Sequence, residues 1–542
     1  MPEELQQPAS GTPVATEKLS AWDPIKVPVF RMLWLTWLTA NTCMWMNDVA
    51  AAWLMTSMTT SPIWVALVQT ASTLPVFMLG LPSGALADIL DRRRYFIMTQ
   101  FWVAVVAVLL CVVVISGVMT PALLLALTFA NGVGLAMRWP VFAAIVPELV
   151  KRAHLPAALA LNGVAMNASR IIGPLLAGAI IASAGTEYVF VLNAVLSVIS
   201  GLVIMRWRRD HVPSPLGRER LVSAIRVGVQ FVRQSSRLRA VLLRVSIFFL
   251  HSTALLALLP LVARNLHGGD AGTFTLLLAS MGVGAIVAAL NLARLRQLMP
   301  RDTLVLRSTI AQSVATVIVA FAPNIYIAVP AMVLNGAAWI SCANSLSVSA
   351  QLSLPDWVRA RGMSIYQMAI MGASAAGAAL WGQIATLTTV AIGLTVAAVS
   401  GTITMLLAQR RIGGDLSIEE DLTPSREFKV PQHEAPGVGQ VVVTIEYIID
   451  PVHSPAFHVL MQESRRSRLR QGALQWELLR DMGKPGRYVE QITDESWTEH
   501  LRRFDRVTAS DVSLRERKLA FHLPEDPPVV TRHIVEDVQR HI

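Results

Sequence analysis

Apolar residues occur in twelve separate blocks of roughly twenty, and this pattern limits the possible folds more than any other feature. A helix of about 20 residues is needed to cross about 30 Å of hydrocarbon. With 54% hydrophobic residues, 15% charged residues and a mean hydropathy of +0.51, the composition argues against a water-soluble protein. The sequence therefore predicts an all-α membrane protein of twelve helices in two six-helix halves. The expected spans are residues 29–56, 62–87, 95–117, 121–146, 157–184, 187–206, 238–262, 271–293, 303–322, 325–352, 361–385 and 388–408.

Basic residues are concentrated in every second connection between these blocks, for example at residues 91–94, 206–239 and 410–411. The alternate connections hold almost no Lys or Arg. Cytoplasmic loops carry an excess of positive charge, so we expect both termini in the cytoplasm and a multi-pass protein in the bacterial inner (plasma) membrane. These loops also explain the net charge of +10. The lipid bilayer is therefore the expected partner, and nucleic acid is not.

The chain divides into six parts by composition. The parts are a polar segment at 1–28, a first half at 29–206, an amphipathic cytoplasmic linker at 207–237, a second half at 238–411, a second linker at 412–439 and a cytoplasmic domain at 440–542. In the first linker, apolar residues recur at helical spacing among arginines, so this segment either rests on anionic lipid headgroups or serves only as a tether. Residues 147–151 resemble residues 355–359, as expected for halves that are parallel structural repeats.

The connection after the second block reads GALADILDRRR. It resembles the signature loop of the major facilitator superfamily, Gly-x-Leu-Ala-Asp-x-x-Gly-Arg-Arg/Lys, with Asp91 in place of the usual glycine. The glycine would allow close approach of two helices, and the first aspartate could pair with an arginine or with a helix N-terminus. The alternative is a basic loop that serves topology alone. The resemblance implies a conformational latch made by Gly84, Asp88, Arg92 and Arg94.

Two further segments carry the same resemblance. Residues 170–178, RIIGPLLAG, resemble the superfamily's antiporter motif through Gly173, Pro174 and Gly178, which favours export; the alternative is an ordinary interface of small residues. Residues 355–367, PDWVRARGMSIYQ, form a loop motif of the second half with Pro355, Asp356, Arg359 and Arg361. Residues 22–411 are thereby similar to the branch that includes the enterobactin exporter and transmembrane secretion effectors. That resemblance implies proton-driven efflux of a small, amphipathic or anionic molecule.

The charged or titratable side chains inside the apolar blocks include Asp48, Arg138, Arg170 and His251. A charge at the centre of a membrane helix costs roughly 2.5–3.5 kcal/mol or more, so each is a functional hypothesis. We expect Asp48 either to gain and lose a proton during transport or to form a structural hydrogen bond or ion pair. Arg138 and Arg170 would neutralise it or bind an anionic substrate. His251 is expected to be a neutral, hydrogen-bonded side chain.

The last hundred residues have the pattern of a soluble domain. Alternation predicts strands at 441–449, 473–480, 487–493 and 529–535, with helices at 454–470 and 496–506. The order βαββαβ is that of a ferredoxin-like fold. The domain resembles the dimeric α/β barrels of antibiotic-biosynthesis monooxygenases, at Arg468, Trp476, Glu490 and residues 496–501. The resemblance implies a homodimer or a regulatory role, with catalysis as the alternative. His500 is either a group of a substrate-activating pocket of that class or, as we expect from its charged sequence neighbours, a residue on a solvated helix face.

These features favour a secondary active transporter, a proton-coupled exporter of drug-like or siderophore-like molecules that works by alternating access. The sequence holds no GxxxxGK[ST] phosphate loop, so ATP is not the energy source by that route. We expect no catalytic residue, no cofactor and no metal site. The alternative is a membrane-tethered enzyme or regulator whose oxygenase-like domain acts on the cargo or senses it.

Overall fold

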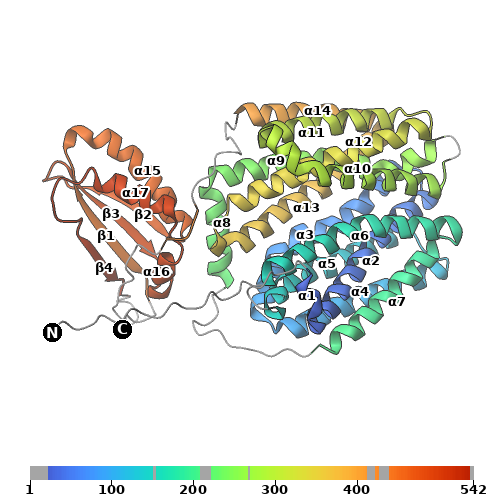
Figure 1. Cartoon of the computed structure of the whole chain (residues 1–542), viewed down its shortest axis with the longest axis horizontal. Coiled ribbons are helices and arrows are strands. Elements are labelled where there is room, and N and C mark those ends of the chain that lie inside the picture. Colours follow the sequence, from blue (N-terminus) through green and yellow to red (C-terminus); the bar gives the residue numbers. More distant parts are fainter. Residues whose placement is uncertain are drawn as a thin grey trace, which may run out of the picture.

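The computed structural model describes residues 22–150, 154–207, 221–266, 269–411, 422–425 and 439–536. Its helical bundle consists of two groups of helices that face each other, and a smaller α/β domain lies at one end of the bundle (Figure 1). Residues 1–21, residues 208–220 and most of the linker at 412–439 lie outside the described residues.

The described part of the chain holds twelve long helices in two sets of six, as the sequence predicts. The first half contains the short α1 (Asp23–Lys26) and then α2 (Pro28–Met58), α3 (Pro62–Ile89), α4 (Arg92–Ile115), α5 (Pro121–Leu149), α6 (Leu155–Ser183) and α7 (Thr186–Met205). The second half contains α9 (Ser236–Asn265), α10 (Ala271–Leu298), α11 (Arg301–Ala320), α12 (Ile325–Leu352), α13 (Asp356–Leu387) and α14 (Val390–Arg411). Helix α8 (Leu221–Gln234) lies between the halves.

Among the described helices, eleven are long and apolar enough to cross a membrane. Helix α2 is the long helix that falls short of this measure, because Asn41, Asn47, Asp48 and several tryptophans lower its hydropathy. Several helix starts follow directly from the local sequence. Proline occupies the first turn of α2, α3, α5 and α6, where its missing N–H costs nothing.

The two halves share one hydrophobic core at the end of the bundle farther from the C-terminal domain. That core combines Met46 and Val49 of α2 with Leu255 and Leu258 of α9 and Phe274 of α10. Opposite this joined end, each half has its own hydrophobic core, while α3 and α13 still connect the halves, since a Cβ atom on Gly80 would lie 2.8 Å from Cγ of Met368. Polar contacts strengthen the joined end: Ile63 donates its N–H to Oγ1 of Thr386 at 3.0 Å, and Arg264 donates to the carbonyl of Thr56.

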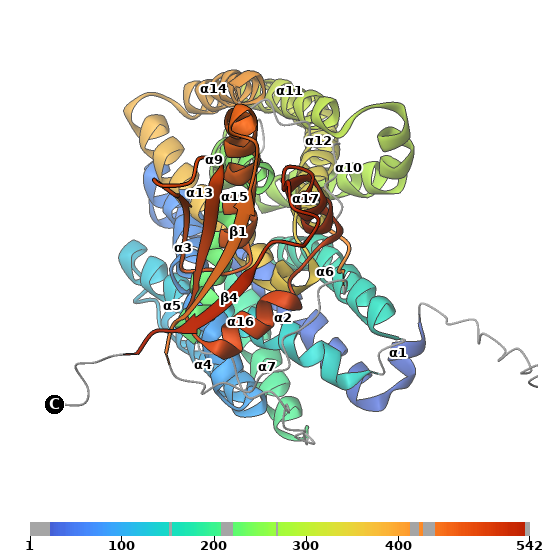
Figure 2. The same ribbon diagram turned by 90° about the vertical axis from the view of Figure 1, so that its left-hand side faces the viewer.

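The C-terminal domain is a four-stranded antiparallel sheet with helices. Strands β1 (Val441–Ile448), β2 (Gln475–Arg480), β3 (Arg487–Asp494) and β4 (Val530–Ile534) lie in the order β2-β3-β1-β4. Helix α15 (Ser454–Arg470) follows β1, and α16 (Trp497–Phe504) follows β3, which gives the predicted βαββαβ order. A further helix, α17 (Ala509–Leu519), was not predicted. In Figure 2 the domain faces the viewer with the helical bundle behind it.

Helix α8 packs against the C-terminal domain. Arg226 forms an ion pair with Glu495 at 2.6 Å, and Gln230 donates to the carbonyl of Ala473 at 2.7 Å. Arg506 of the domain lies 5.2 Å from the ring centre of Trp357, near the start of α13. The sequence predicted that the arginine-rich α8 either rests on lipid headgroups or serves only as a tether. In the structure one of its arginines, Arg226, instead binds the C-terminal domain.

Candidate functional site

The arginine of α6 lies between the two halves of the bundle. The Arg170 guanidinium is 5.1 Å from the ring centre of Trp45 on α2 and 4.4 Å from that of Trp339 on α12. An arginine over an aromatic face is held by the ring's negative potential. Although Arg170 is in the middle of a membrane helix, its side chain is exposed, and among the described residues it has no carboxylate partner. Its N–H groups are therefore available to an anion.

Close packing of α6 fixes the position of this arginine. A Cβ atom on Gly173 would lie 2.5 Å from Cβ of Trp45 and 3.0 Å from the carbonyl oxygen of Thr42, so α6 touches α2 directly at the glycine. One turn further, the glycine at position 178 lies against Thr275 of α10, in the other half. The small residues of the antiporter-like motif thus form two helix contacts, one within the first half and one between the halves, and Pro174 lies between them within α6.

Asp48 lies one turn beyond Trp45 on α2. Its Oδ1 atom is buried and has no hydrogen-bond partner among the described residues. The preceding Asn47 accepts a hydrogen bond from Asn193 at 3.2 Å, and that residue in turn accepts from Ser197 at 3.3 Å. The carboxyl group is therefore next to a polar network on α2 and α7 that leaves its own oxygen unsatisfied.

Arg138 does not lie near Arg170. It is buried, donates to Oε1 of Gln100 at 3.2 Å and lies 5.4 Å from the ring centre of Trp37, which stacks on Phe142. Trp37 is eight residues before Trp45, about 12 Å along the same helix. The structure therefore brings Arg170 to the boundary between the halves and leaves Arg138 inside the first half.

The signature loop joins α3 to α4. Asp91, in the position usual for glycine, caps α4 by accepting from the backbone N–H of Arg94 at 2.8 Å. Arg93 donates to the carbonyls of Trp207 and of Met205, the latter at 2.8 Å, which ties α4 to the end of α7. The side chain of Asp88 lies outside the described residues, so the latch of Gly84, Asp88, Arg92 and Arg94 stays a prediction.

The loop motif of the second half lies beside α8. Pro355 is the N-cap residue of α13, and Arg359 donates to the carbonyl of Leu354 at 3.5 Å. A Cβ atom on Gly228 of α8 would lie 3.2 Å from Cβ of Arg361, so the linker helix passes directly over the motif. The side chain of Asp356 lies outside the described residues.

A buried ion pair in the second half was not predicted. Arg244 of α9, 2% exposed, donates to Asp302 at the start of α11 at 2.8 Å. The connection between α10 and α11 occupies the same place in the second half as the signature loop does in the first. Asp302 could have been predicted from this correspondence. Like Asp91 in the first half, it is an acid at the start of a helix that follows a basic loop.

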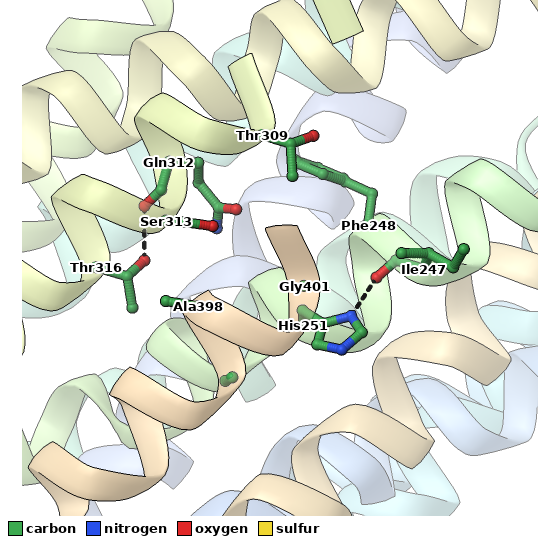
Figure 3. A pocket seen from close by; sticks show the side chains of 10 residues that line it. Ile247, Phe248, His251, Thr309, Gln312, Ser313, Thr316, Ala398 and Gly401 are labelled. Atoms are coloured by element: carbon green, nitrogen blue, oxygen red, sulfur yellow. Dashed lines mark hydrogen bonds between the residues drawn. The ribbon is translucent and has the colours of Figure 1, made fainter. Parts of the chain in front are cut away.

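His251 belongs to a small polar cavity inside the second half. The cavity, about 10 Å³, is lined by α9, α11 and α14 (Figure 3), and this volume suits about one water molecule. Nδ1 of His251 lies 2.7 Å from the carbonyl oxygen of Ile247, and the ring is 5.5 Å from that of Trp381. His251 is hydrogen-bonded as predicted.

The C-terminal domain contains a buried carboxylate surrounded by donors. Glu490 is fully buried and accepts from Trp476 at 2.9 Å, Ser464 at 2.7 Å and Lys518 at 3.2 Å. Burial alone would favour the neutral acid, but the positive charges of Lys518 and Arg468 outweigh it and hold the pKa of Glu490 well below its usual range. Glu490, Lys518 and Arg468 thus form an ionic network within the domain.

The expectation for His500 is wrong. The side chain is 3% exposed, and its Nδ1 lies 2.8 Å from Asp494 of β3, which also accepts from Arg503 at 2.7 Å. Nε2 of His500 is 3.3 Å from Nε of Arg532 on β4. Charged sequence neighbours suggested a solvated face, but Asp494, six residues earlier, and Arg532 on the distant β4 contact the imidazole inside the domain.

Two facing six-helix halves define the fold of the major facilitator type. Solved structures with this fold include a mutant of the nucleoside transporter NupG, with a TM-score of 0.60 and 12% identity over 71% of this chain and 100% of that one. A POT family transporter in complex with 5-aminolevulinic acid has a TM-score of 0.57 and 12% identity over 72% of this chain and 97% of that one. At such identities the likeness shows the fold alone.

The profile of the transmembrane secretion effector family matches residues 19–541, and the chain belongs to this family. Its relatives include the staphyloferrin A transporter of Staphylococcus aureus, 22% identical over 60% of this chain and 81% of that protein. The enterobactin exporter EntS of Citrobacter koseri is 24% identical over 67% of this chain and 86% of that protein. The protein is therefore a multi-span membrane transporter for a small molecule.

Proposed function

We propose that the protein exports a small, amphipathic anion across the bacterial inner membrane in exchange for protons. The observation that carries this proposal is the exposed Arg170 between Trp45 of one half and Trp339 of the other. Two aromatic faces keep the guanidinium plane oriented, while its N–H groups remain able to bind a carboxylate or a similar anion. An amphipathic cargo would pack on the same indoles.

The location of this arginine suits alternating access. Its two aromatic neighbours belong to different halves, so any rocking of the halves changes the surroundings of the bound anion. The halves share a core at the end farther from the C-terminal domain. With the termini in the cytoplasm, as the basic loops favour, this is the conformation whose binding site faces the cytoplasm, where an exporter collects its cargo.

Asp48 is the proposed proton carrier. It is one turn from Trp45, and its buried Oδ1 has no partner among the described residues. A protonated carboxyl group would move across the low-dielectric interior at lower cost than a carboxylate. Two relatives are named for staphyloferrin A and enterobactin, and we infer a siderophore-like cargo for this chain as well.

Transport by proteoliposomes containing the full-length protein tests both roles, with enterobactin, staphyloferrin A and anionic dyes as probes. We expect Arg170→Gln to abolish uptake by protein molecules whose cytoplasmic side faces the outside of the proteoliposomes, and Arg170→Lys to retain part of it. Arg31→Gln is the matched control, because this exposed arginine at the start of α2 is distant from the site in sequence. Asp48→Asn should lose accumulation driven by a proton gradient but retain exchange of cargo for cargo. Wild-type transport by Arg170→Gln, or gradient-driven accumulation by Asp48→Asn, would refute the corresponding role.

For the C-terminal domain we propose regulation rather than catalysis. Its buried acids, Glu490 and Asp494, are each paired with basic side chains of the same domain. A homodimer through this domain remains a prediction from the resemblance.

A further inference from the structure

A cavity of about 500 Å³ lies where the C-terminal domain meets the transporter. The end of α8 and the start of α9 line one side, and α15 and the start of α17 line the other. Pockets for small molecules commonly measure about 300–1,000 Å³, so this junction cavity has room for a ligand of nucleotide size. Its lining residues are Arg233, Gln234, Ser236, Arg239, Glu463, Arg466, Arg470, Ser510, Asp511, Ser513, Leu514 and Arg517.

The lining is strongly basic. Five arginines face two acids, and both acids are already engaged within the domain. Glu463 accepts from Arg517 at 2.6 Å. Asp511 accepts from Ser467 at 2.5 Å and from the backbone and side chain of Thr508 at 2.9 and 2.8 Å. Five arginines against two acids leave the lining of the junction cavity with a net positive charge.

Three of the arginines come from three different helices. Arg233 is on α8, Arg239 on α9 and Arg466 on α15, and within the described ranges none of them forms an ion pair. Guanidinium groups bind phosphate in a bidentate manner, which makes a converging set of arginines a phosphate-binding arrangement.

Backbone groups add to this preference. Helix α9 begins at Ser236 and α17 at Ala509, and the first-turn serines Ser236 and Ser510 line the cavity. The dipole at a helix N-terminus favours an anion, although Ser235 at α9 and the capping box of Thr508 and Asp511 at α17 already satisfy part of the first-turn N–H groups. Hydroxyl groups at the same positions offer further donors.

We propose that the junction cavity binds a phosphate-bearing polyanion, either a soluble compound or an anionic lipid headgroup, which holds the C-terminal domain on the transporter. A ligand that contacts α8 and α9 on one side and α15 and α17 on the other binds only when the two parts are together. By linkage, it stabilises that docked arrangement. The inference does not depend on proton coupling or on the identity of the cargo.

Titration of the full-length protein with inorganic pyrophosphate tests the proposal. The protein is placed in phosphatidylcholine nanodiscs at about 0.15 M salt, where exposed charges are screened beyond about 8 Å. We expect calorimetric binding by the wild type and at least tenfold weaker binding by the double variant Arg239→Gln with Arg466→Gln. Arg465→Gln is the matched control, since it removes one charge from the neighbouring exposed position of α15 outside the cavity. The control should bind like the wild type.

Three further measurements complete the test. Arg466→Lys keeps the charge without the bidentate geometry, so its affinity should lie between those of the wild type and the double variant. Amide exchange in α8 should slow when pyrophosphate binds. In nanodiscs containing phosphatidylglycerol, competition with pyrophosphate would identify a lipid headgroup as the natural ligand, and unchanged affinity would identify a soluble one. Absence of pyrophosphate binding to the wild type in neutral nanodiscs, or equal binding by the double variant, would overturn the proposal.

Discussion

Substitution of Gly178 by alanine should shift the transporter away from the conformation described here. An added methyl group would overlap the side chain of Thr275 on α10, across the boundary between the halves. Overpacking of this kind costs about 1–3 kcal/mol, and the penalty disappears when the halves separate at this end. The ratio of joined to separated molecules should therefore fall by about 5- to 150-fold.

Distances between spin labels measure this ratio directly. Labels at Ser57 and Leu387, exposed near the ends of α2 and α13, report whether the joined end has opened, in a background without the native cysteines. Gly163→Ala, on the same helix as Gly178, is the control, because a Cβ atom there would meet nothing within 4 Å. It also carries the same gain in helix propensity. An unchanged distance distribution for Gly178→Ala, or an equal shift for the control, would refute the reasoning.

Two predictions concern the C-terminal domain of the full-length protein. Glu490→Gln should destabilise the domain by about 3–5 kcal/mol, because the buried Lys518 and the partly buried Arg468 would lose their acid. Faster amide exchange in β1 and β3 is the measurement, and wild-type rates would contradict the prediction. The second prediction follows from the low pKa of Glu490. An acid with a depressed folded-state pKa stabilises the fold above its unfolded pKa of about 4.3, and this stabilisation is lost as the pH falls below that value. Exchange in β3, corrected for its intrinsic rate, should stay constant from pH 7 to about 5 and then rise, less steeply in Glu490→Gln.

The long helices follow from the sequence because membrane thickness sets their length and apolarity marks their position. Helix α17 was missed for a related physical reason. Leu514 is its buried apolar residue, so the helix has almost no apolar periodicity. Its start was nevertheless marked, since Thr508 and Asp511 form a capping box that satisfies backbone donors on both sides.

The site residues show what a local pattern leaves out. Apolar surroundings identify Arg138 and Arg170 equally, yet one lies inside a half and the other between the halves. The difference depends on tryptophans at positions 37, 45 and 339, which no short-range spacing connects to either arginine. For His500 the same reason applies to Arg532 on β4, whereas Asp494 lies only six residues before the histidine.

The polar character of α2 has a consequence for how the protein is made. This helix precedes the other long helices in the chain, yet by composition it does not meet the measure of a membrane span that those eleven meet. Its neighbours in the finished bundle include α6 and α7, which leave the ribosome more than a hundred residues later. During that interval α2 should remain at the translocon or with an insertase. Biogenesis of the first half is then a delayed, collective step in which α2 enters the bilayer together with the helices that bury its asparagines.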